Sequence, residues 1–252
     1  MGTVQRHDPG LHQESVRLNK YLAQAGIGSR RSNDELILSG AVKVNGRVIV
    51  ELGVKVNPRR DTVTVRGNPV YLTQKQVYYV FNKPKDTITT VKDERGRPTV
   101  MDYVRAKERI YPIGRLDRNT TGVLLFTNDG ELANGLMHPK LEVEKVYHVR
   151  LEKGISDDDF RKLKTGIPLE DGVAKANFAE VLPKTRRTEL FVSIHEGKNR
   201  EVRRMFEEMD YDVKKLDRIS FAGITTTGLS RGKFRKLNSR EVEHLKKVAG
   251  MI

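Results

Sequence analysis

One acidic residue, Asp117, stands in a polar loop that runs directly into a strongly apolar segment. The stretch reads GRLDRNTTGVLLFTNDG over residues 114–130. Catalytic groups are often carried by loops that a rigid strand holds in place, so this carboxylate is a candidate catalytic group. The alternative from the pattern alone is that Asp117 caps a turn, which aspartate frequently does.

Motifs for metals and common cofactors are missing from the sequence. The chain has no cysteine, which excludes disulfides, cysteine-ligated zinc or iron–sulfur sites and cysteine nucleophiles. It lacks a GxxxxGK[ST] phosphate loop, a GxGxxG turn after a strand and a GxSxG nucleophile elbow. The histidines have no zinc-ligand spacing, and isolated ones such as His138 and His195 are more often surface or core residues. We therefore expect no metal and no cofactor.

The net charge predicts a polyanionic partner. Lys and Arg number 47 against 33 Asp and Glu, a surplus of +14 in 252 residues, which favours RNA, DNA or an anionic membrane face. No apolar run approaches the ~20 residues of a membrane helix, and residues 1–15 lack the apolar middle of a signal peptide. We expect a cytoplasmic, monomeric protein without membrane contact.

The composition divides the chain into three parts. Residues 1–15 are polar and contain Pro9 and Gly10, which is typical of a flexible tail. Residues 16–75 form a small basic unit and its linker. Residues 76–252 form a larger unit that mixes strand-like and helix-like patterns.

The small unit has clear local signals. Apolar residues at helical spacing over 18–25 predict a helix, and the SNDE sequence at 32–35 is a capping-box pattern for a second one. Asn-Gly at 45–46 between β-branched runs predicts a hairpin with a type I′ turn. A strand is expected over 62–66, and the sequence GNPVYLTQKQ at 67–76 indicates a linker.

The larger unit is expected to be an α+β domain. Helices are predicted to start at Ser156, near Asn199 and at Ser239. Runs of strands with accompanying helices favour a mainly antiparallel, mixed sheet flanked by helices. The strand candidates are residues 77–81, 123–127, 146–151, 178–182 and 190–194.

Five motifs follow one another along the chain. They are YVFNKP at 79–84 with GRPTVMD at 96–102, GRLDRNTTGVLLFTNDGELANGLMHP at 114–139, EKVY at 144–147, EGKNREVRRM at 196–205, and LDRI at 216–219. In this order they resemble the RsuA/RluB-type pseudouridine synthases, which isomerise uridine in ribosomal RNA. Residues 16–66 resemble the S4-type RNA-binding module usual at the N-terminus of that family. One departure is Asp86, where the family usually has glycine.

The resemblance implies that Asp117 is catalytic. The reaction breaks the N1–C1′ bond of uridine and rejoins the base through C5, with no net redox change. It requires an ionised carboxylate, either to attack covalently or to remove a proton while a glycal forms. Burial beneath a base raises the pKa of a carboxyl group, and a neighbouring arginine lowers it. By motif match this arginine is Arg203, with Arg200 as second choice. Without the resemblance, the residues favour a solvated basic helix face or phosphate contacts by Arg200, Arg203 and Arg204.

The resemblance also assigns residues around the base. Tyr147 resembles the family's active-site tyrosine, which would stack on the flipped uracil and whose hydroxyl could help to remove the C5 proton. Leu216 and Ile219 would form an apolar floor under the base, although lone aliphatic residues are otherwise ordinary core. The further substrate-binding residues expected are Arg115, Arg118, Thr120 and Arg200.

RNA binding is expected to use both units. Unstacking the target base costs a few kcal/mol, and contacts to the RNA backbone can offset that cost. In the small unit, cations lie around a helix start and a hairpin turn, which together suit phosphate. The residues expected to bind RNA there are Arg30, Arg31, Lys43, Asn45 and Arg47.

Only the basic motif, EGKNREVRRM at 196–205, indicates which ribosomal RNA is the target. Its NREVRRM form is more similar to the RluB branch than to the RsuA branch, which favours 23S over 16S ribosomal RNA. The alternatives are a 16S-directed synthase and a non-catalytic ribosome assembly factor that keeps an inactive synthase scaffold.

Overall fold

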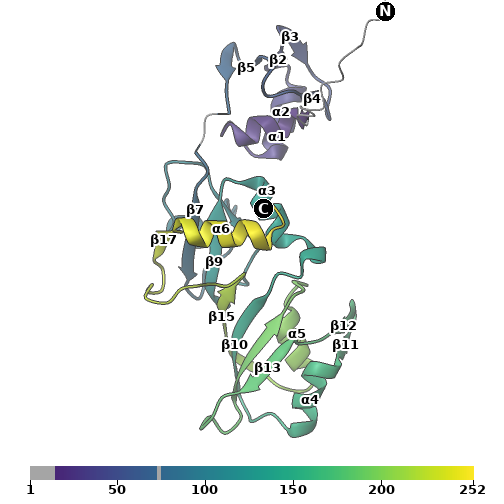
Figure 1. The fold of residues 1–252 in the computed structure, drawn as a ribbon, viewed down its shortest axis with the longest axis vertical. Coiled ribbons are helices and arrows are strands. Elements are labelled where there is room, and N and C mark those ends of the chain that lie inside the picture. Colours follow the sequence, from purple (N-terminus) through teal and green to yellow (C-terminus); the bar gives the residue numbers. More distant parts are fainter. Residues whose placement is uncertain (1–14, 73–74) are drawn as a thin grey trace, which may run out of the picture. The chain divides into compact units, whose positions relative to one another are not determined.

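The computed structural model describes residues 15–72 and 75–252. The chain divides into two compact units, Met1–Lys75 and Gln76–Ile252 (Figure 1). Apart from Ser15, the tail predicted over residues 1–15 lies outside the described residues. Each unit has its own core and is described by itself.

The small unit packs helices against short antiparallel strands. Its elements are β1 (Val16–Arg17), α1 (Leu18–Gln24), α2 (Arg30–Leu38), β2 (Val42–Val44), β3 (Arg47–Ile49), β4 (Lys55–Val56), β5 (Val63–Val65) and β6 (Asn68–Val70). The larger of its sheets has the order β3-β2-β5-β6. Leu18, Tyr21 and Leu22 of α1 are buried together with Ile37 of α2 and Val63 of β5. The predicted apolar face of the first helix is therefore confirmed.

The structure confirms the hairpin turn and corrects two neighbouring predictions. Asn45 and Gly46 both have positive φ, +51° and +81°, as a type I′ turn requires. The capping box lies three residues earlier than predicted, because Ser29 caps α2 and exchanges hydrogen bonds with Ser32. The linker predicted over residues 67–76 is wrong for residues 68–70, which form β6 at the edge of the sheet. Proline is tolerated on such an edge strand.

The large unit contains the rest of the described elements. They are β7 (Tyr78–Lys83), a 3₁₀ helix η1 (Val100–Asp102), β8 (Tyr111–Ile113), β9 (Thr121–Thr127), α3 (Gly130–Met137), a 3₁₀ helix η2 (Pro139–Leu141), β10 (Lys145–Leu151), α4 (Asp157–Thr165), β11 (Ile167–Leu169), β12 (Gly172–Ala174), β13 (Phe178–Val181), β14 (Glu189–Ile194), α5 (Glu201–Glu207), β15 (Val213–Phe221), β16 (Ile224–Thr225), β17 (Phe234–Lys236) and α6 (Ser239–Val248). All five predicted strands and all three predicted helices are present near their expected positions.

The large unit is built on one nine-stranded sheet. Its strand order is β13-β14-β10-β15-β9-β7-β17, with β16 beside β15 and β8 beside β9. Among the strand pairs described in this sheet, β9 and β15 are parallel and the others are antiparallel. This confirms the expected α+β fold with a mixed, mainly antiparallel sheet.

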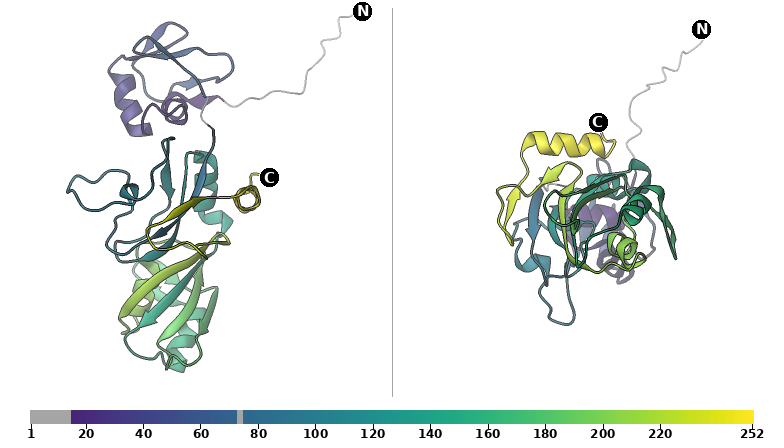
Figure 2. Two further views of the ribbon diagram at one scale, coloured as in Figure 1. Left: turned by 90° about the vertical axis from the view of Figure 1, so that its left-hand side faces the viewer. Right: turned by 90° about the horizontal axis from the view of Figure 1, so that it is seen from below.

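Helices cover both faces of this sheet (Figure 2). On one face, Leu132 of α3 and Leu245 of α6 pack with Val123 of β9. On the other face, Met205 of α5 packs in one core with Leu124 of β9. Successive residues of β9 thus point to opposite faces, as strand geometry requires. None of the described helices has the length and apolar character needed to cross a bilayer.

The parallel contact between β9 and β15 depends on Gly122. This residue has φ of +105°, and a Cβ atom placed on it would lie 2.2 Å from the carbonyl oxygen of Arg218. Only glycine lets the two backbones approach this closely. The contact brings the loop before β9, which carries Asp117, beside residues 216–218 of β15.

Candidate active site

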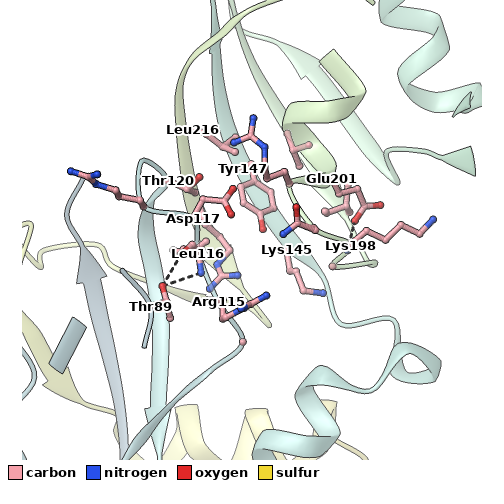
Figure 3. A pocket seen from close by; sticks show the side chains of 18 of the residues that line it. Thr89, Arg115, Leu116, Asp117, Thr120, Lys145, Tyr147, Lys198, Glu201 and Leu216 are labelled. Carbon is pink, nitrogen blue, oxygen red and sulfur yellow. Dashed lines mark hydrogen bonds between the residues drawn. The ribbon is translucent and has the colours of Figure 1, made fainter. Parts of the chain in front are cut away.

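A pocket of about 450 Å³ opens in the large unit where the loop before β9 meets β10, β15 and the segment before α5 (Figure 3). Asp117 projects into it toward the ring of Tyr147, and Leu216 lies beside that ring. Seven residues expected at the site from the sequence line this pocket: Arg115, Asp117, Arg118, Thr120, Tyr147, Arg200 and Leu216.

The backbone around Asp117 is held by a buried ammonium group. Lys83, at the end of β7, is completely buried. Its Nζ donates to the carbonyl oxygens of Pro84, Asp117, Arg118 and Thr120 at 2.9–3.2 Å. Burial lowers the pKa of Lys83 to about 8, although the charge of Asp117 opposes the shift. Lys83 therefore fixes the backbone of the loop that carries Asp117.

The conformation of the neighbouring loop explains the departure at Asp86. Asp86 has φ of +60°, a left-handed conformation that glycine adopts without strain and aspartate tolerates better than most residues. Its carboxylate lies 3.3 Å from the guanidinium of Arg118. The residue that replaces glycine thus contacts an arginine of the candidate site.

Tyr147 and Leu216 come from adjacent strands. Tyr147 on β10 is the direct neighbour of Arg218 on β15, and Leu216 lies two residues before Arg218. Tyr147 is 8% and Leu216 is 5% exposed, yet both line the pocket. An aromatic face and an aliphatic side chain at one pocket wall provide a stacking surface for a planar base. Ile219, the other expected floor residue, is not among the residues that line the pocket.

Arg203 lies near Asp117 without touching it. It is half-buried on α5, and its Nη1 donates to the carbonyl oxygen of Val213 at 2.9 Å. Its Nε is buried without a hydrogen-bond partner among the described residues. Burial and the charge of Arg200 lower the pKa of Arg203, whereas the charge of Asp117 raises it. No ion pair between Arg203 and Asp117 is found within 4 Å among the described residues, so a direct salt bridge stays a prediction.

Exposed cations surround the opening of the pocket. Arg115, Arg118 and Arg200 are exposed, and Arg200 pairs with Glu207 at 2.8 Å. Thr120 is different, because it is buried and its Oγ1 has no hydrogen-bond partner among the described residues. The rim therefore carries positive charge that suits an anionic ligand.

Several pocket residues were not anticipated from the sequence. Lys145 and Arg218 are buried cations, and Glu201 is a buried acid. Burial lowers the pKa of Lys145 to about 8, and Arg218 adds to this effect. Strand alternation could have identified two of them, because residues two positions apart on a strand point to the same face. Lys145 precedes Tyr147 by two residues, and Arg218 follows Leu216 by two.

These residues have different partners. The Nζ of Lys145 donates to the carbonyl oxygens of Val143 and His195. The Nε of Arg218 donates to the carbonyl oxygen of Val123, while its Nη2 has no partner among the described residues. Burial raises the pKa of Glu201, whose carboxylate accepts the backbone N–H of Lys198 at 3.1 Å. Lys145 and Glu201 therefore bond the segment before α5, whereas Arg218 joins β15 to β9.

The residues expected to bind RNA in the small unit are all exposed. Arg30 and Arg31 occupy the first turn of α2, where free N–H groups and the helix dipole favour anions. Lys43 and Arg47 flank the turn between β2 and β3. The side chain of Asn45 instead supports that turn, because it accepts the N–H of Thr62 and donates to Asp61.

A metal centre is not evident in the described part of the chain, where no three His, Cys, Asp or Glu side chains gather in a way that could hold a metal ion. The groups available at the pocket for chemistry are two carboxyl groups, Asp117 and Glu201, the phenol of Tyr147 and several cations.

Comparisons with known proteins show which family the chain resembles in sequence and fold. Residues 77–208 match the RNA pseudouridylate synthase family, and residues 16–61 match the S4 domain. The chain is 45% identical to ribosomal large subunit pseudouridine synthase B of Bacillus subtilis (strain 168), covering 92% of this chain and 96% of that protein. It is 43% identical to an uncharacterized RNA pseudouridine synthase of Aquifex aeolicus (strain VF5), covering 94% and 96%.

A solved structure of a pseudouridylate synthase superposes with a TM-score of 0.65 at 26% identity, covering 92% of this chain and 100% of that one. The match therefore includes both the sequence and the fold. With an S4 domain at its N-terminus, this chain belongs to the RNA pseudouridylate synthase family.

Proposed function

We propose that this protein isomerises uridine to pseudouridine in 23S ribosomal RNA, with Asp117 as its catalytic residue. The observation that carries the proposal is a pocket in which the Asp117 carboxylate faces the ring of Tyr147, with Leu216 beside it (Figure 3). The large-subunit target is supported by the B. subtilis relative, whose name specifies the large ribosomal subunit.

The reaction conserves all atoms of the nucleotide. The N1–C1′ bond breaks, a C5–C1′ bond forms, C5 loses its proton and N1 gains one. The Asp117 carboxylate either attacks the nucleoside covalently or removes a proton while a glycal forms. The base stays in the pocket after the N1–C1′ bond breaks and until the C5–C1′ bond forms. No cofactor is therefore needed to carry it.

Tyr147 and Leu216 support the base during this exchange. The Tyr147 ring stacks on the flipped uracil, and its hydroxyl helps to remove the C5 proton. Leu216 provides an apolar surface that excludes water from the base. A dry pocket strengthens the interaction between Asp117 and any nearby cation.

Arg203 is the proposed charge partner of Asp117. Its guanidinium interacts electrostatically with that carboxylate, and its buried Nε has an unused donor. A contact between these two charges in the RNA complex is part of the proposal. Such contact lowers the pKa of a carboxyl group and offsets the effect of covering it with a base.

The cations hold the RNA. Arg115, Arg118 and Arg200 at the rim contact phosphates beside the flipped nucleotide. Arg30 and Arg31 bind phosphate at the start of α2 in the S4 domain, with Lys43, Arg47 and Asn45 near the hairpin turn completing that surface. These contacts supply the few kcal/mol that unstacking a base requires. We further propose that the protein acts as a monomer in the cytoplasm, where ribosomal RNA is made.

The test is tritium release from C5 of uridine. Full-length protein is incubated with 23S and 16S transcripts that carry [5-³H]uridine. The proposal predicts release from 23S RNA at a stoichiometry near one per transcript, and none from 16S RNA. Release from 16S RNA alone would show that the target lies in the small-subunit RNA. No release from either transcript would favour a non-catalytic RNA-binding protein. Mapping pseudouridines in cells with and without the protein identifies the nucleotide.

A further inference from the structure

A closed loop lies between β7 and η1, and a residue at its neck contacts the segment that carries Asp117. Ile88 and Thr99 form a bridge at its neck, where the N–H of Ile88 bonds the carbonyl of Pro98 and the N–H of Val100 bonds the carbonyl of Ile88. Thr89 stands at this neck, is 7% exposed and lines the pocket. Its position is fixed by backbone hydrogen bonds on the neighbouring residue.

The hydroxyl of Thr89 bonds both polar backbone groups of Leu116, the residue before Asp117. Thr89 Oγ1 donates to the carbonyl oxygen of Leu116 at 2.7 Å and accepts its N–H at 3.2 Å (Figure 3). A hydroxyl can do both at once, because it has one donor and two acceptor positions. Leu116 is buried, so both of its backbone groups would be unsatisfied without this contact.

These hydrogen bonds complement those of Lys83. Lys83 binds the carbonyls of Asp117, Arg118 and Thr120, which fixes the chain from Asp117 onward. Thr89 fixes the chain at Leu116, immediately before Asp117. The carboxylate is thus carried by a backbone that is held on both sides.

We propose that Thr89 is a positioning residue for the Asp117 carboxylate. It acts through the backbone of Leu116 and does not touch the reacting atoms. The inference rests on the proposed function, because it assumes that Asp117 is catalytic. A displacement of about 1 Å at a reacting group can lower a rate about 100-fold, so loss of this contact should reduce turnover more than RNA binding.

Two substitutions at Thr89 separate its hydroxyl from its shape. Thr89→Val keeps the branched side chain and removes the hydroxyl, whereas Thr89→Ser keeps the hydroxyl. Thr87 provides a matched control from the same segment. It is 1% exposed, and its Oγ1 donates to the carbonyl oxygen of Lys85 at 3.3 Å, so Thr87→Val removes a buried hydroxyl that does not contact Leu116.

The first measurement is the rate of tritium release from 23S transcript by each full-length variant. We expect Thr89→Val to lower kcat by about tenfold or more, with KM within about threefold of wild type. Thr89→Ser and Thr87→Val should stay within about threefold in both constants. Equal losses in the two valine variants, or a loss confined to KM, would overturn the proposal.

The second measurement does not depend on activity. Amide hydrogen exchange of the peptide containing residues 115–120 should quicken in Thr89→Val and not in Thr87→Val. Unchanged exchange would show that Thr89 does not hold Leu116. If the wild type releases no tritium, the proposed function fails, while the exchange comparison still decides whether Thr89 orders this loop.

Discussion

Replacing Lys83 by methionine should separate the placement of Asp117 from the stability of the fold. Methionine fills a similar apolar volume but cannot donate to the carbonyls of Asp117, Arg118 and Thr120. Hydrogen bonds from charged donors contribute roughly 1.5–3 kcal/mol each. The substitution therefore removes the hydrogen bonds through which Lys83 holds the loop from Asp117 onward. We expect kcat for tritium release to fall about 100-fold, which corresponds to about 2.7 kcal/mol.

The effect of Lys83→Met on stability should depend on pH. The folded pKa of about 8 lies below the ordinary value of 10.5, and this gap is on the order of 3 kcal/mol. Between these values the unfolded chain binds more protons than the folded chain at Lys83, so wild-type stability rises with pH there. Relative to Lys83→Met, the free energy of unfolding of the wild type should rise by on the order of 2–3 kcal/mol from pH 7 to pH 10.

Urea unfolding at several pH values and single-turnover tritium release measure the two effects. Lys85→Met, which removes an exposed lysine two residues away, serves as the activity control and should stay within about twofold of wild type. Wild-type turnover in Lys83→Met would refute the argument that this ammonium group positions Asp117. A stability difference that does not change with pH would show that Lys83 does not titrate in the folded protein as its burial implies.

Three further perturbations test other parts of the account. Gly122→Ala should destabilise the large unit by about 3 kcal/mol or more in urea unfolding, since its Cβ would lie 2.2 Å from the carbonyl of Arg218; wild-type stability would contradict the described β9–β15 contact. Arg203→Met should lower kcat about 100-fold, and Arg203→Lys should lower it less, because the lysine keeps the charge. Equal rates in the two variants would argue against an electrostatic role of Arg203. Combined replacement of Arg30 and Arg31 by alanine should weaken RNA binding and reduce the slope of log K against log salt by about 1.4–1.8; an unchanged slope would mean that these residues do not contact phosphate.

Local sequence signals predicted those parts of the fold that depend on local structure. Asn45-Gly46 predicted a turn with positive φ at both residues, and that is what the structure has. Ser156 was predicted to begin a helix, and its side chain accepts the N–H of Asp159 at the start of α4. Both patterns act within a few residues, so a single sequence contains all the information that they require.

Elements with weak local signals were missed. The helix α3 contains Gly130 and Gly135, which lower helix propensity. Gly135 is nevertheless required, since a Cβ there would lie 2.8 Å from the Cβ of Ala249 near the end of α6. The strand β15 carries charged residues between its apolar ones. Tertiary packing, rather than local preference, determines both elements.

The candidate site shows the same contrast between residues that motifs identify and contacts that depend on tertiary structure. The motifs placed Asp117, Tyr147 and Leu216 together, and all three line one pocket. The burial of Lys83 and the contact of Thr89 with Leu116 were not predictable, because they join residues 27 to 37 positions apart in sequence. Such contacts depend on the pairing of β7 with β9 and on the closed loop after β7, which no short motif encodes.

The central claim is that the charge of one carboxylate carries the reaction. Asp117→Asn keeps the size and shape of the side chain and removes that charge. With wild-type protein as reference, the measurement is tritium release from [5-³H]uridine-labelled 23S transcript at saturating enzyme, together with RNA affinity. We predict that release falls at least about 1,000-fold while affinity stays within about threefold. Undiminished release by Asp117→Asn would contradict the account, whatever the other variants do.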